Sequence, residues 1–134
     1  MTKIFRTAVF NLLLVFTFSP FVQAATAQEL LIQYADMAKI SVNMFSIERG
    51  KTLYFTHVKD WSCASCHTEN PKNQGKHIVT NRVIEPLSPK NNINRFSNFN
   101  KNEKWFTRNC KEVIGRECTP TEKGDFISYV LSIN

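Results

Sequence analysis

The hydrophobic and polar positions of this chain follow a helical period near its two ends and lose that period in the middle. Between Gln28 and Lys39, apolar side chains recur at the spacing of one helix face: Leu30, Leu31, Tyr34, Ala35 and Ala38. A second helical pattern runs from Ile47 to His57. From Glu69 to Phe99 the sequence is rich in Asn, Pro and Lys without a sustained period, which predicts a long loop.

Start and stop signals predict two more helices in the last third of the chain. Asn100, followed three residues later by Glu103, is a candidate N-terminal cap, and Gly115 is a candidate stop. The run from Thr119 to Glu122 is a stronger signal, because it combines a capping threonine, a proline at the first helical position and a glutamate placed to reach back. These patterns predict a mainly helical chain with helices at both ends.

The first 24 residues are predicted to be a secretory signal peptide. Lys3 and Arg6 give it a positive start, and the apolar run that follows is about half of the roughly 20 residues needed to span a membrane. Cleavage is expected after Ala24 or as late as Ala27, which leaves one domain over residues 25–134. We therefore expect a periplasmic protein that does not span the membrane when mature.

The net charge of the chain indicates which kind of macromolecule it could bind. The 134 residues carry a formal net charge of +6, of which Lys3 and Arg6 account for two, so the mature chain carries +4. Such a modest excess suits an acidic protein partner, and export argues against nucleic acid.

The strongest chemical motif is Cys63-Ala64-Ser65-Cys66-His67. Two thiols separated by two residues can add to the two vinyl groups of one haem, and the adjacent histidine is then the proximal iron ligand. A thiol redox pair or a metal site without haem is the competing interpretation. With haem c attached, the terminal helices predict an all-α, class I cytochrome c-like fold. In such a fold a glycine such as Gly50 lets the first helix approach an aromatic side chain of the last one.

The residues alone do not decide which side chain binds the other face of the iron. The three methionines all precede the haem motif, and His57 is too close to it in sequence. His77 could reach from the following loop, whereas a lysine would have to be buried as a neutral amine. Asn109 shares a face with Trp105 and Val113 on a helix expected from about Lys101 to Val113. On the residues alone, the more usual role of an asparagine there is a hydrogen bond to a loop carbonyl or a propionate.

Other residues have candidate supporting roles. Trp105 is expected to pack against the haem ring. Lys76, Arg82 and Arg95 are candidate partners of the haem propionates, because buried carboxylates favour charge-assisted donors. Once Cys63 and Cys66 are assigned to haem, two cysteines remain, Cys110 and Cys118, and export favours a disulfide between them.

Three stretches of the chain resemble the sphaeroides haem protein (SHP) family of monohaem, class I-like cytochromes c. They are Glu103 to Cys118, Glu85-Pro86-Leu87-Ser88-Pro89 with Arg95-Phe96, and Glu122-Lys123-Gly124-Asp125. The resemblance implies that Asn109 is the distal iron ligand and that Cys110 pairs with Cys118. One departure is Thr80-Asn81-Arg82 where the family would have Thr-Gly-Lys; asparagine tolerates a positive φ, so the turn is expected to form.

The resemblance also implies a function. An asparagine ligand would leave the iron on reduction, so that ferrous haem could bind O2, NO or CO, and a dihaem cytochrome c fed by a membrane cytochrome b would donate the electrons. The alternative is a simple electron-transfer cytochrome whose sixth ligand, such as His77, stays bound. No acid–base constellation accompanies the predicted iron site, so an enzyme with a defined substrate is not predicted.

Overall fold

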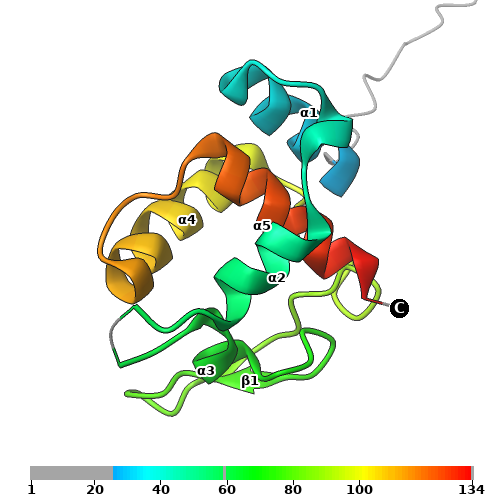
Figure 1. Ribbon diagram of the computed structural model, residues 1–134. Helices are drawn as coiled ribbons and strands as arrows, with labels where there is room; N and C mark the ends of the chain where they lie inside the picture. The colour runs from blue at the N-terminus through cyan, green and yellow to red at the C-terminus, as the bar shows by residue number, and fades with distance from the viewer. Residues whose placement is uncertain (1–25, 59, 134) are drawn as a thin grey trace, which may run out of the picture.

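The computed structural model describes residues 26–58 and 60–133, and the predicted signal peptide, residues 1–24, lies outside them. The described chain is mainly helical (Figure 1), as predicted. Its elements, in order, are α1 (Ala27–Ala38), a 3₁₀ turn η1 (Val42–Met44), α2 (Ile47–Phe55), α3 (Cys63–His67), β1 (Gly75–Lys76), β2 (Val83–Ile84), α4 (Phe99–Ile114) and α5 (Pro120–Ser132). In this part of the chain, no helix has the length and apolar character of a membrane span.

Helix boundaries follow the capping residues. At the start of α5, the Thr119 hydroxyl accepts from the backbone N–H of Glu122, whose carboxylate accepts from the backbone N–H of Thr119, so the predicted capping box is present. Gly115 ends α4 with φ of 76°, also as predicted. The predicted cap at Asn100 is wrong: Asn98 is the N-cap, and its side-chain oxygen accepts from the backbone N–H of Lys101 at 2.9 Å.

A capping box also begins α1, where Thr26 is the N-cap and Glu29 reaches back to it. This box bears on the two predicted cleavage positions. Cleavage after Ala24 would leave it whole, whereas cleavage after Ala27 would remove Thr26 and the first residue of α1.

The long connection between α3 and α4 contains a feature that the sequence did not predict. β1 and β2 form a short antiparallel pair, with Gly75 opposite Ile84 and Lys76 opposite Val83. Asn81 lies between them with φ of 57°, and its backbone N–H donates to the His77 carbonyl at 2.8 Å. The expected turn therefore forms with asparagine at the left-handed position.

α2 and α5 cross at the centre of the molecule, between α1 at one end and the segment carrying α3 and β1 at the other (Figure 1). A methyl group at Gly50 would collide with the backbone carbonyl of Asp125 and lie 2.9 Å from Cβ of Tyr129. The Asp125 carboxylate accepts from Nε of Arg49 at 2.7 Å and from the backbone N–H of Ser46 at 2.6 Å. The predicted contact of Gly50 with an aromatic residue of the last helix is thus present. The helix that makes this close approach is α2, not the first helix of the chain.

A partly buried carboxylate, that of Glu103, holds α4 to the other helices. The Glu103 carboxylate accepts from the Tyr34 hydroxyl of α1 at 2.8 Å and from Nζ of Lys123 of α5 at 2.8 and 2.9 Å. Burial raises the pKa of Tyr34, and the neighbouring Glu103 raises it further, so the phenol stays a neutral donor. Phe106 of α4 packs edge-on against the rings of Tyr34 and Phe126. One wall of the molecule, α4, is therefore fixed to both α1 and α5.

We expect Gly50→Ala to destabilise the haem-loaded protein by about 2–3 kcal/mol, because the added methyl meets backbone rather than a movable side chain. Urea unfolding followed by far-UV circular dichroism measures the loss. Lys51→Ala, at the exposed neighbouring position of α2, is the matched control. Equal midpoints for the two variants would contradict the close crossing.

Candidate haem site

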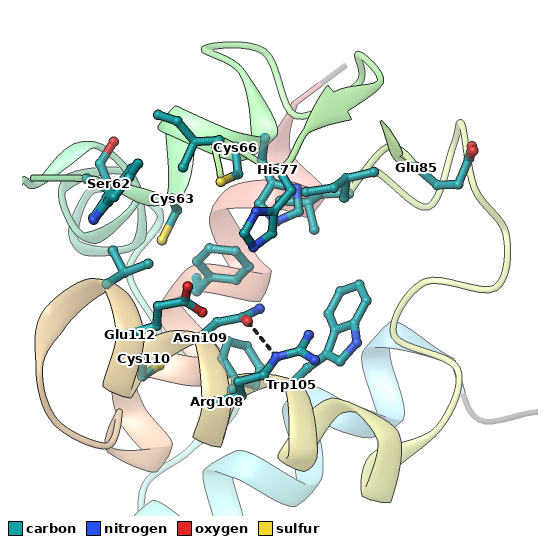
Figure 2. A pocket seen from close by; sticks show the side chains of 18 of the residues that line it. Ser62, Cys63, Cys66, His77, Glu85, Trp105, Arg108, Asn109, Cys110 and Glu112 are labelled. Atoms are coloured by element: carbon teal, nitrogen blue, oxygen red, sulfur yellow. Dashed lines mark hydrogen bonds between the residues drawn. The ribbon is translucent and has the colours of Figure 1, made fainter. Parts of the chain in front are cut away.

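A cavity of about 760 Å³ lies between α3, the β1–β2 segment and α4. Its volume falls within the roughly 300–1,000 Å³ of cofactor and ligand pockets. The residues with chemical groups that line it include Cys63, Cys66, His67, His77, Arg82, Glu85, Arg95, Trp105, Arg108, Asn109 and Glu112. The predicted site residues from distant parts of the chain are thus brought together around one space (Figure 2).

One wall of the cavity is α3, which carries the Cys-x-x-Cys-His motif. Both thiols are free. The hydroxyl of Tyr54, from α2, donates to the His67 carbonyl at 3.1 Å and to the Thr68 carbonyl at 2.6 Å, which fastens the end of α3 to the core. β1 covers the other side of α3 closely, since a methyl group at Gly75 would collide with the Cys66 carbonyl.

Burial sets the protonation states of His67 and Cys63 on this wall. Together with a smaller effect of the Arg95 guanidinium, it lowers the pKa of His67 to about 4, so the imidazole is neutral at pH 7 and able to bind a metal. Burial also raises the pKa of the Cys63 thiol to about 11. Reactive cysteine pairs depend on a lowered pKa, so the electrostatics of this motif do not favour a thiol redox site.

The opposite wall is α4. Trp105, Asn109 and Val113, which were predicted to share one helix face, all line the cavity. Figure 2 shows the Asn109 carboxamide entering the cavity from the side opposite Cys66. Its Oδ1 accepts a hydrogen bond from Nε of the preceding residue, Arg108, at 3.3 Å. An amide side chain therefore faces the haem motif across the cavity.

The two other histidines lie elsewhere. His57 is exposed and does not line the cavity. His77 does line it, but on the same side as Cys66 (Figure 2). Nδ1 of His77 accepts from the backbone N–H groups of Val79 and Thr80 at 3.3 Å each, so this ring helps to fold its own turn.

Of the three candidate propionate partners, Arg82 and Arg95 line the cavity and Lys76 does not. The Arg95 guanidinium donates to the carbonyls of Pro86 and Glu85, at 2.8 and 2.6 Å, and lies 4.2 Å from the ring centre of Trp105. Burial lowers the pKa of Arg95, although a guanidinium remains charged at neutral pH. This cation is thus held at the cavity by backbone carbonyls and an aromatic ring.

Sequence reasoning missed Arg108 and Glu112, two further charged residues of α4 that line the cavity. Both are exposed, as charged helix residues usually are. The available signal was their spacing: each lies within three residues of Asn109 on the same helix.

Comparison with known proteins identifies the family. Residues 40–130 match the family described as Domain of unknown function (DUF1924). The chain is 38% identical to cytochrome c'' of Methylophilus methylotrophus over 133 residues, covering 93% of this chain and 91% of that protein. It is 36% identical over 88 residues to the cytochrome c-type protein SHP of Cereibacter sphaeroides, covering 62% of this chain and 67% of that protein.

The chain belongs to the SHP-like monohaem c-type cytochromes. The structure of oxidised SHP superimposes with a TM-score of 0.72 at 31% identity, over 80% of this chain and 96% of that one. The crystal structure of oxidised cytochrome c'' gives a TM-score of 0.71 at 39% identity, over 81% and 94%. These matches confirm the predicted cytochrome c-like fold.

As in these relatives, the cofactor is one covalently attached haem c. The residues present fit this group. Two free thiols and a neutral imidazole lie on one wall, and the lining between the walls includes the apolar side chains of Leu53, Leu87 and Phe126.

The predicted disulfide is present next to Asn109. Cys110 and Cys118 are joined, with Cα atoms 5.7 Å apart, and each is 7% exposed. The bond links the last turns of α4 to the residue just before the capping box of α5. It therefore fixes the end of the helix that carries Asn109.

Replacing both cysteines, as Cys110→Ser with Cys118→Ser, should lower the free energy of unfolding by about 2.5 kcal/mol, the chain-entropy value for so short a loop. Urea unfolding of the oxidised, haem-loaded protein measures it. The control is the single variant Ser132→Ala at the end of α5. An unfolding midpoint no lower than that of the control would mean that the disulfide does not stabilise this turn.

Proposed function

We propose that this protein is a periplasmic electron-transfer cytochrome whose weak distal ligand, Asn109, is released on reduction, so that ferrous haem can bind O2, NO or CO. The observation that carries the proposal is the position of the Asn109 amide, which enters the cavity opposite the Cys-x-x-Cys-His motif (Figure 2). Cys63 and Cys66 would hold the haem by thioether bonds, and His67 would be the proximal ligand. Trp105 would pack against the ring.

The haem supplies an iron that changes between ferric and ferrous states and can take a diatomic ligand when ferrous. The chain supplies a neutral amide oxygen, a hard and weak donor that suits ferric iron better than the softer ferrous iron. Fixing the helix end through Cys110 and Cys118 helps such a ligand, because a weak bond forms only when its donor is held at the right place.

Two relatives support separate parts of this proposal. The structure of SHP is described as that of an oxygen-binding cytochrome c. A solution structure of cytochrome c'' from Methylophilus methylotrophus, with a TM-score of 0.67, addresses the structural basis of haem-ligand detachment. Ligand release and gas binding are thus both attributed to proteins of this fold.

The second candidate function is electron transfer with a permanently bound sixth ligand such as His77. It is favoured by one observation, namely that His77 lines the cavity. Against it stand the position of this ring on the side of Cys66 and the use of its Nδ1 by the turn at Val79 and Thr80. Sharp low-spin ferrous bands that carbon monoxide leaves unchanged would favour this candidate.

For the electron donor we propose a dihaem cytochrome c, itself reduced by a membrane cytochrome b, with export through the predicted signal peptide. The rim of the cavity suits a protein partner. Ile78, Val79 and Val83 are about half exposed or more, and Lys76 and Arg82 lie beside them. Apolar contact with a surrounding positive charge would match an acidic redox protein.

Asn109→Ala should leave the haem attached but remove the distal donor. We expect a changed ferric absorption spectrum and ferrous protein that binds carbon monoxide at least as fast as the unmodified protein, because no side chain has to leave. Optical spectra of the ferric, dithionite-reduced and carbon monoxide-treated protein test this. Asn100→Ala, an exposed asparagine of α4 outside the cavity, is the matched control. A spectrum unchanged by Asn109→Ala would overturn the ligand assignment.

A further inference from the structure

Arg108 is a charged residue of the cavity with no place in the function proposed above. It precedes Asn109 on α4, and its side chain is exposed. Nε of Arg108 nevertheless points at its neighbour and donates to Oδ1 of Asn109 at 3.3 Å, the contact drawn as a dashed line in Figure 2. Among the described residues none of the ion pairs includes Arg108, although Glu112 lies one helical turn further on.

We propose that Arg108 is a positioning residue that holds the Asn109 amide oxygen in its released position. The inference rests on the proposed function, in which Asn109 is the distal ligand. Oδ1 is the atom that would bind a hard ferric ion, and it is the same atom that Arg108 contacts. The guanidinium and the metal are thus two positively charged partners of one oxygen.

Two physical effects of this contact favour the open state. At this exposed site a released amide oxygen would otherwise be hydrated by water. Arg108 provides a charge-assisted donor for it without any change in the backbone. While the oxygen is on the metal, a hydrogen bond from a cation draws electron density away from it and weakens it further as a donor.

The location of Arg108 explains how it can reach the amide oxygen once the ligand has left the metal. Both residues are on α4, whose ends are fixed by the Asn98 cap and by the disulfide at Cys110. The amide can therefore move by rotation of its own side chain while the backbone positions of Arg108 and Asn109 stay constant. Arg95, another cation that lines the cavity, is occupied by the carbonyls of Glu85 and Pro86.

The test is the rate at which carbon monoxide binds to the dithionite-reduced protein, followed optically after rapid mixing. Arg108→Gln removes the cationic donor, and the ligand should then stay bound for longer. We expect slower carbon monoxide binding by roughly three- to tenfold, the range for a charge-assisted hydrogen bond at a partly exposed site. Lys104→Gln removes a positive charge from the same helix at an exposed position outside the cavity, and should leave the rate unchanged.

A double variant separates this inference from the proposed function. In the Asn109→Ala background, Arg108→Gln should have no further effect, since no amide remains to be held. Equal rates for Arg108→Gln and Lys104→Gln, or an Arg108→Gln effect that survives in the Asn109→Ala background, would overturn the positioning role. If Asn109→Ala itself changes neither the ferric spectrum nor the rate, the proposed function fails instead. Haem content and far-UV circular dichroism confirm that each variant is folded.

Discussion

The backbone contact between α2 and α5 at Gly50 is the constraint on which both walls of the haem cavity depend. α2 carries Tyr54, whose hydroxyl fastens the end of α3, and α5 carries Lys123, whose ammonium holds Glu103 of α4. Each wall is therefore attached to one member of the crossing pair. A side chain at Gly50 would separate the two helices and, with them, the residues that face one another across the cavity.

The two walls differ in how firmly they are held. The α3 wall is short, is bonded to Tyr54 and is covered by β1 at Gly75, so the Cys-x-x-Cys-His motif has little freedom. The α4 wall is a longer helix fixed at three places: Asn98, Glu103 and Cys110. Between these points Arg108 is exposed and Asn109 is only partly buried, so these side chains have room to change rotamer. Such a division suits the proposed function, in which one iron ligand stays bound and the other is released.

The sequence was most informative where a local rule decides the structure. The capping box at Thr119, the helix stop at Gly115 and the left-handed Asn81 each depend on a few neighbouring residues and were correctly predicted. Two-residue strands have no period to detect, so β1 and β2 were missed. The cap at Asn98 was mistaken for Asn100 because both residues are asparagines at the start of one helical pattern. Which of Lys76, Arg82 and Arg95 reaches the cavity depends on how the long loop folds back, and only a structure gives that.

The disulfide has a consequence for how the protein is made. Its two pairs of cysteines have opposite requirements, since Cys63 and Cys66 must stay reduced to accept haem while Cys110 and Cys118 must be oxidised. Cysteines close in sequence form a disulfide readily, so Cys63 and Cys66 could be joined to each other instead of to haem. The second pair is buried, and thiol–disulfide exchange needs access to the sulfur atoms. In the folded chain Cys110 and Cys118 are less exposed than Cys63 and Cys66, so a reductant should act on the haem-binding thiols first, and early folding of the α4–α5 turn would favour correct maturation.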